Sequence, residues 1–144
     1  MRLDSIHGWE ATLLEPKKFW AEVPPQYYSR YHFYNMPISD EMNAIASPLR
    51  ILKEITSPDD FVALKLDIDK PSIEIPIAKR LLSDPILAGL LDEFFFELHF
   101  QCDLIAGCWN QKPAEMMGLK LDRYSVLLFF KSFREAGIRS HFWP

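Results

Sequence analysis

The sequence predicts an α/β fold with a mostly parallel sheet, arranged as one domain over residues 1–144. A chain of 144 residues that is 49% hydrophobic has the size of one domain with a real core. Short apolar runs bounded by turn residues alternate with longer stretches of helical period, which is typical of β-α-β units. The sequence has 11 prolines and only 5 glycines, and it lacks both G-x-G-x-x-G and the P-loop motif, so it predicts no glycine-rich phosphate loop.

The first third of the chain predicts two strands and two helices. The turn residues Pro24 and Pro37 mark the ends of a helix and a strand, because proline breaks both kinds of hydrogen-bond ladder. Ser47 and Pro48 supply an N-cap and a first helical turn. The predicted elements are a strand at Leu3–Trp9, a helix at Glu15–Val23, a strand at Tyr31–Asn35 and a helix at Pro48–Ile55.

The rest of the chain predicts three strands and two helices. Phe61–Leu66 is the strongest strand, and the second, Phe94–Phe100, has an apolar run expected to be buried on both faces. Core positions also include Phe129, Phe130 and Trp143. The remaining elements are a helix at Ile75–Leu91 interrupted at Asp84-Pro85, an irregular loop at Gln101–Gly118, a helix at Leu121–Ala136 capped by Gly137, and a closing strand at Ile138–Phe142.

The net charge and the N-terminal residues indicate which partners and which cellular location to expect for this protein. A net charge of −4 without a basic cluster predicts no nucleic-acid partner. No run approaches the roughly 18 apolar residues of a membrane helix. The first nine residues lack the apolar core of a signal peptide, and Cys102 and Cys108 have neither redox nor disulfide-framework spacing, so a cytoplasmic location is expected.

Asp67 and Asp69 directly follow the strongest predicted strand, at the sheet edge where open α/β folds bind ligands. In extended backbone, residues i and i+2 point the same way, so the two carboxylates could hold one cation. This D-x-D pattern is compatible with a metal-dependent nucleotide-sugar glycosyltransferase, with a haloacid-dehalogenase-type phosphatase, which Pro71 disfavours, or with a methyltransferase. A turn in which Asp69 caps the following helix near Ser72 is the structural alternative.

Three segments together resemble the FkbM-type class I S-adenosylmethionine-dependent methyltransferases. The matching segments are Gly8-Trp9-Glu10, Tyr31 to Asp40, and Lys65-Leu66-Asp67-Ile68-Asp69 with Glu74 beyond. Their order and spacing resemble the second, third and fourth strands of that family, and Phe94 to His99 would be the fifth. The resemblance covers residues 7–100 and implies a three-layer Rossmann-like methyltransferase fold.

The resemblance also implies roles for individual residues. Glu10 would bind the ribose hydroxyls of S-adenosylmethionine, Ser39 and Asp40 would lie near its adenine, and Asp67 near its methionine end. Asp69 and Glu74 would shape the acceptor side or bind a metal. The implied reaction is methyl transfer to an oxygen or nitrogen of a small-molecule or glycan acceptor.

The sequence departs from the family in two places. Asp67-Ile-Asp69-Lys-Pro71 replaces the family's D-x-E-G turn. The family's first strand and glycine-rich loop would precede Glu10 by some thirty residues, where this sequence has nine. The expected fold is therefore incomplete at the N-terminus, and the sheet would need self-association or a partner chain unless its second and fourth strands pair directly. A non-catalytic interaction fragment is the further alternative.

The four histidines, His7, His32, His99 and His141, lie in or beside predicted strands. His99 is the candidate for an acid/base or substrate-contact role, because it follows Glu97 at a strand end. With Cys102 and Asp103 it could also offer nitrogen, sulfur and oxygen to a metal, although zinc sites usually have closer paired spacings.

Overall fold

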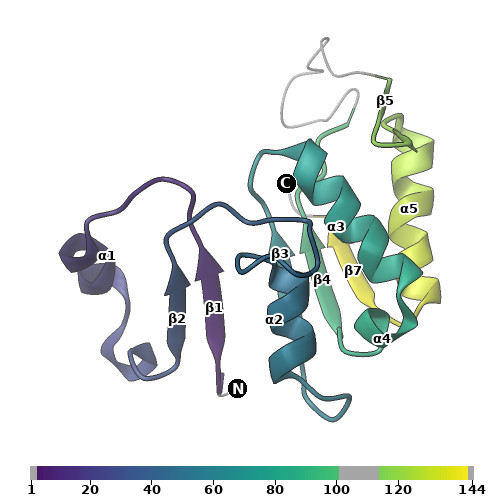
Figure 1. The fold of residues 1–144 in the computed structure, drawn as a ribbon. Coiled ribbons are helices and arrows are strands. Elements are labelled where there is room, and N and C mark those ends of the chain that lie inside the picture. Colours follow the sequence, from purple (N-terminus) through teal and green to yellow (C-terminus); the bar gives the residue numbers. More distant parts are fainter. Residues whose placement is uncertain (1–2, 101–113, 143–144) are drawn as a thin grey trace. The chain divides into compact units, whose positions relative to one another are not determined.

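The computed structural model describes residues 3–100 and 114–142 (Figure 1). The chain divides into two compact units, residues 1–48 and residues 49–144. Both units combine helices with parallel strands, so the predicted mixed α/β character is confirmed. The prediction of a single domain stays a prediction.

The first unit is a small parallel β-α-β arrangement. Strand β1 (Ile6–Trp9) pairs with β2 (Tyr31–Tyr34), and α1 (Pro16–Glu22) and a short 3-10 turn (Pro25–Tyr27) connect them. Phe19 of α1 stacks on Phe33 of β2 with ring centroids 3.8 Å apart, which packs the helix on the strand. Gly8 lies close to Tyr31, and a Cβ at this position would be 2.6 Å from the Tyr31 hydroxyl, so a larger residue would require the Tyr31 side chain to shift.

The second unit contains a three-stranded parallel sheet in the order β3 (Ala63–Leu66), β4 (Glu93–Phe96) and β7 (Arg139–Phe142). Its helices are α2 (Pro48–Ile55), α3 (Pro71–Ser83), the single turn α4 (Pro85–Ala88) and α5 (Arg123–Glu135). A short antiparallel hairpin, β5 (Glu115–Met116) with β6 (Leu119–Lys120), precedes α5.

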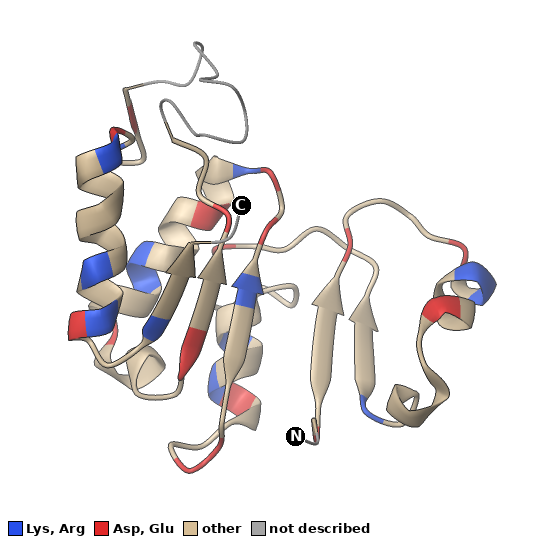
Figure 2. Cartoon of the chain, turned by 180° about the vertical axis from the view of Figure 1, so that it is seen from behind, with Lys and Arg blue, Asp and Glu red and all other residues tan. Residues whose placement is uncertain are grey.

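One face of the β3–β4–β7 sheet carries the core. Phe94 and Phe96 are fully buried, and their rings contact Phe133 and Phe130 of α5. Figure 2 shows the opposite face, with α2 and α3 behind the strands. On this opposite face Phe95 is only half-buried and stacks on His141 with ring centroids 4.5 Å apart. The prediction that the whole Phe94–Phe96 run is core is therefore wrong for Phe95, because side chains alternate between the two faces of a strand.

The turn that ends α5 fixes the direction of β7. The amide of Ile138 donates to Phe133 O at 2.9 Å and that of Gly137 donates to Arg134 O at 3.1 Å, which is the hydrogen-bond pattern of a Schellman motif. Gly137 has φ of 91°, as the motif requires. Ile138 and Phe133 are both buried beside this turn, so the predicted glycine cap is confirmed.

Two element predictions need correction. The third helix begins at Pro71 instead of Ile75, because proline is well suited to the first helical turn, where its missing N–H costs nothing. Residues 115–120 form the β5–β6 hairpin inside the segment predicted to be a loop, with positive φ at Met117 and Gly118. The rest of that predicted loop, with Cys102, Cys108 and Trp109, and Trp143 as well, falls outside the described residues.

Among the described residues, β1 pairs with β2 in the first unit, and β4 pairs with both β3 and β7 in the second. None of the helices in the described ranges has both the length and the apolar content needed to cross a bilayer.

Candidate functional site

The carboxyl ends of β3 and β4 bring acidic side chains together in the second unit. Leu66 and Phe96 are register partners in this parallel pair, so Asp67 and Glu97 leave the sheet next to each other. The amide of Glu97 donates to Leu66 O at 3.1 Å, which extends the ladder to this point. In Figure 2 the red acidic positions at these strand ends mark the site.

The carboxyl groups of Asp67 and Glu97 shift each other's pKa in opposite directions. A hydrogen bond from the Glu97 carboxyl, together with the Lys65 ammonium 2.6 Å away, holds the pKa of Asp67 below its usual range. The same hydrogen bond, with burial, raises the pKa of Glu97 to about 7. Two carboxylates this close cannot both ionise easily, so the pair keeps one proton until the pH rises to about 7.

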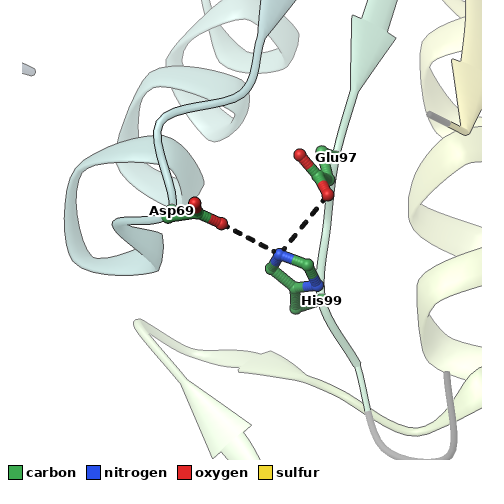
Figure 3. Close-up of side chains that lie close together, drawn as sticks. All are labelled: Asp69, Glu97 and His99. Carbon is green, nitrogen blue, oxygen red and sulfur yellow. Dashed lines mark hydrogen bonds and ion pairs between the residues drawn. The ribbon is translucent and has the colours of Figure 1, made fainter. Parts of the chain in front are cut away.

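His99 links the ends of β3 and β4. Its Nε2 lies 3.2 Å from Oδ1 of Asp69 and 3.6 Å from Oε1 of Glu97 (Figure 3). The side chains of His99 and Glu97 are 20% and 22% exposed, whereas that of Asp69 is 82% exposed. His99 and Glu97 are therefore largely buried, whereas Asp69 reaches them from the surface.

The backbone around Asp69 differs from the extended conformation that the sequence suggested. Asp69 has φ of 55°, so the argument that Asp67 and Asp69 point the same way does not apply. Asp67 bonds to Lys65 and Glu97, and Asp69 to His99. The two acids of the D-x-D motif thus have different partners.

Glu74, at the start of α3, supports the turn that carries Asp69. Its side chain is 1% exposed, and its Oε1 accepts a hydrogen bond from the Ile68 amide at 3.0 Å. Burial raises the pKa of Glu74 above its ordinary value. This acid therefore shapes the turn from inside the protein.

The remaining predicted cofactor residues belong to the first unit. Glu10 directly follows β1, and its Oε1 accepts a hydrogen bond from the Thr12 amide at 2.6 Å. Ser39 and Asp40 lie in the segment after β2, where the Ser39 hydroxyl accepts from the Glu41 amide. Each of these side chains is partly exposed.

Glu97 is a site residue that the sequence pattern did not indicate. The signal that could have identified it is its position directly after β4, equivalent to that of Asp67 after β3, because neighbouring parallel strands end at the same edge. The predicted ligand set of His99 with Cys102 and Asp103 lies partly outside the described residues.

Comparison with known proteins adds no relative to this description. No family model matches the chain, and no curated protein or solved structure matches it.

Proposed function

We propose that this chain is an S-adenosylmethionine-dependent methyltransferase-like protein with its reactive site at the carboxyl ends of β3 and β4. The observation that carries the proposal is the pair of carboxyl groups, Asp67 and Glu97, that end two neighbouring parallel strands. The sequence resemblance implies that the charged end of the cofactor would lie near Asp67, and ligands of open α/β sheets bind at this edge.

The chemistry of these side chains fits the charged end of the cofactor. S-adenosylmethionine supplies an electrophilic methyl group on a sulfonium and carries an ammonium beside it. Asp67, whose pKa is held low, stays ionised and offers a negative charge to such a cation. The Lys65 ammonium balances part of that charge.

Glu97 fits the acceptor side of a methyl transfer. A hydroxyl acceptor loses its proton as its oxygen bonds to the methyl carbon, and a carboxylate with a pKa near 7 can take that proton at neutral pH. Proton transfer of this kind contributes typically about 10²–10⁴-fold to a rate. His99, the acid/base candidate from the sequence, and Asp69, expected on the acceptor side, lie beside this carboxyl: the His99 Nε2 is 3.6 Å from Oε1 of Glu97 and 3.2 Å from Oδ1 of Asp69.

The glycosyltransferase alternative receives less support from this geometry. It requires Asp67 and Asp69 to hold one metal, and they contact different partners here. The proposal of a non-catalytic fragment predicts no binding of the cofactor at all.

Calorimetric titration with S-adenosylhomocysteine and with sinefungin, whose extra ammonium mimics the positive sulfonium, tests the proposed function. We expect saturable binding of both, with sinefungin tighter, and a loss of that preference in Asp67→Asn. Asp59→Asn is the matched control, because Asp59 is an exposed acid in the turn before β3. Absence of binding, or binding with an unchanged preference in Asp67→Asn, would overturn the proposal.

A further inference from the structure

The side chains of Asp69, Glu97 and His99 converge from two segments of the chain (Figure 3). Asp69 comes from the turn between β3 and α3. Glu97 and His99 come from the segment that follows β4, where they are two positions apart. One ligand atom from each residue, the imidazole Nε2 and two carboxylate oxygens, lies within 4.8 Å of the other two. Three potential metal-binding atoms thus lie close together.

We infer that Asp69, Glu97 and His99 form a site for one divalent transition-metal ion, with zinc-type coordination. Ligand atoms about 2.0–2.2 Å from zinc in a tetrahedral site lie roughly 3.3–3.6 Å from one another. The separations from Nε2, 3.2 Å to Asp69 and 3.6 Å to Glu97, are already close to that spacing.

The contact between His99 and Glu97 suits two ligands of one ion better than a hydrogen bond. An N–H···O bond prefers about 2.7–3.2 Å, whereas these two atoms are 3.6 Å apart. Asp69 can complete the set, because its side chain is 82% exposed and its Oδ1 already lies 3.2 Å from the His99 Nε2.

The donor set selects the class of metal. One imidazole nitrogen with two carboxylate oxygens suits zinc, manganese or iron, whereas magnesium and calcium prefer oxygen alone. Three protein ligands leave a coordination position for water or for a substrate oxygen, as in catalytic zinc sites. The site therefore has the composition of a reactive centre.

A buried neighbour supports the turn that carries Asp69. The Glu74 side chain accepts a hydrogen bond from the Ile68 amide and so fixes the turn before Asp69. The inference is independent of cofactor binding; with an ion bound, Glu97 serves as a ligand instead of a proton acceptor.

Titration of the chelator-treated full chain with Co²⁺, followed by visible absorption, and with Zn²⁺, followed by calorimetry, tests the site. We expect one equivalent of each metal per chain, without any cofactor analogue. Asp69→Asn and His99→Gln should each weaken binding by at least about tenfold, because each removes a direct ligand, and even outer neighbours of a metal cost 10–100-fold. Near-UV circular dichroism of both variants confirms that they fold.

Two control variants test whether the metal binds at other potential ligands instead of this site. His141→Gln removes an imidazole that also lies near a carboxylate, 3.5 Å from Glu93, and it should leave binding unchanged. A Cys102→Ser, Cys108→Ser double variant should bind metal as tightly as the natural chain does. The Co²⁺ spectra of both proteins should lack thiolate charge-transfer bands. Binding lost in the cysteine variant, or retained in full by Asp69→Asn and His99→Gln, would overturn the inference.

Discussion

Asp67 and Glu97 stand side by side where two parallel strands end, and their carboxyl groups share a hydrogen bond. In metal-free protein, we expect the Glu97 carboxyl to titrate with an apparent pKa of about 7 in carbon-13 NMR. Asp67→Asn should lower that value, because it removes the neighbouring negative charge and the carboxylate that accepts the hydrogen bond. An unchanged Glu97 titration in Asp67→Asn would contradict the coupling.

The same pair affects stability in a definite direction. Since folding raises the pKa of Glu97, its protonated form favours the fold, and this contribution is lost as the pH rises from about 4.5 through about 7. Glu97→Gln keeps a neutral side chain throughout. Its stability, measured by urea unfolding, should therefore fall less than that of the natural chain between these two pH values.

Glu74 provides a second test of buried charge. Burial raises its pKa above the ordinary 4.5, so the fold favours the protonated form and loses that contribution as the pH rises above 4.5. Glu74→Gln retains an oxygen for the Ile68 amide and carries no charge. Urea unfolding at pH 4 and pH 8 should show the variant gaining stability over the natural chain at the higher pH. Glu115→Gln, an exposed change, is the control, and an equal pH response in both variants would refute this prediction.

Local sequence signals predicted most of the elements, because the deciding interactions are short in range. Residues Pro48–Ile55 form the helix that Ser47 and Pro48 indicated, and Gly137 ends α5 as its conformational freedom predicts. The β5–β6 hairpin was missed, since two-residue strands carry too little periodicity to be recognised.

The candidate site was predictable only in part. The strand end at Asp67 follows from apolar patterning, but the neighbour of Asp67 depends on which strand pairs with β3, and the sequence pattern does not specify register with Glu97. The positive φ of Asp69 was also hidden, because aspartate adopts this conformation only in particular turns. The contact of Asp69 with His99 is therefore information that the tertiary structure adds.

The aromatic core of the second unit should control its stability. Phe133 is fully buried, and its ring centroid lies 4.9 Å from that of Phe94 and 5.2 Å from that of Phe129. Phe133→Ala should destabilise the protein by about 3–5 kcal/mol, because it removes apolar burial and leaves a cavity. On the same helix, Leu127 is 59% exposed, and Leu127→Ala should stay within about 0.5 kcal/mol. If chemical denaturation gives similar losses of stability for Phe133→Ala and Leu127→Ala, this face of α5 is not the core. Phe133→Leu replaces Phe133→Ala in the comparison if the alanine variant does not fold.

Substitutions at Gly137 measure the free-energy cost of a backbone conformation without a change in packing. Its φ is 91°, and a Cβ added there would meet nothing within 4 Å. Any cost of Gly137→Ala therefore comes from placing an L side chain in the left-handed region, which is about 1–2 kcal/mol. Gly137→Asn should cost less, because asparagine tolerates positive φ better than alanine does. Thermal and urea unfolding of the two variants measure the difference. If Gly137→Ala costs no more stability than Gly137→Asn, the turn relaxes on substitution. The Schellman hydrogen bond from the Ile138 amide to Phe133 O then does not fix the path from α5 into β7.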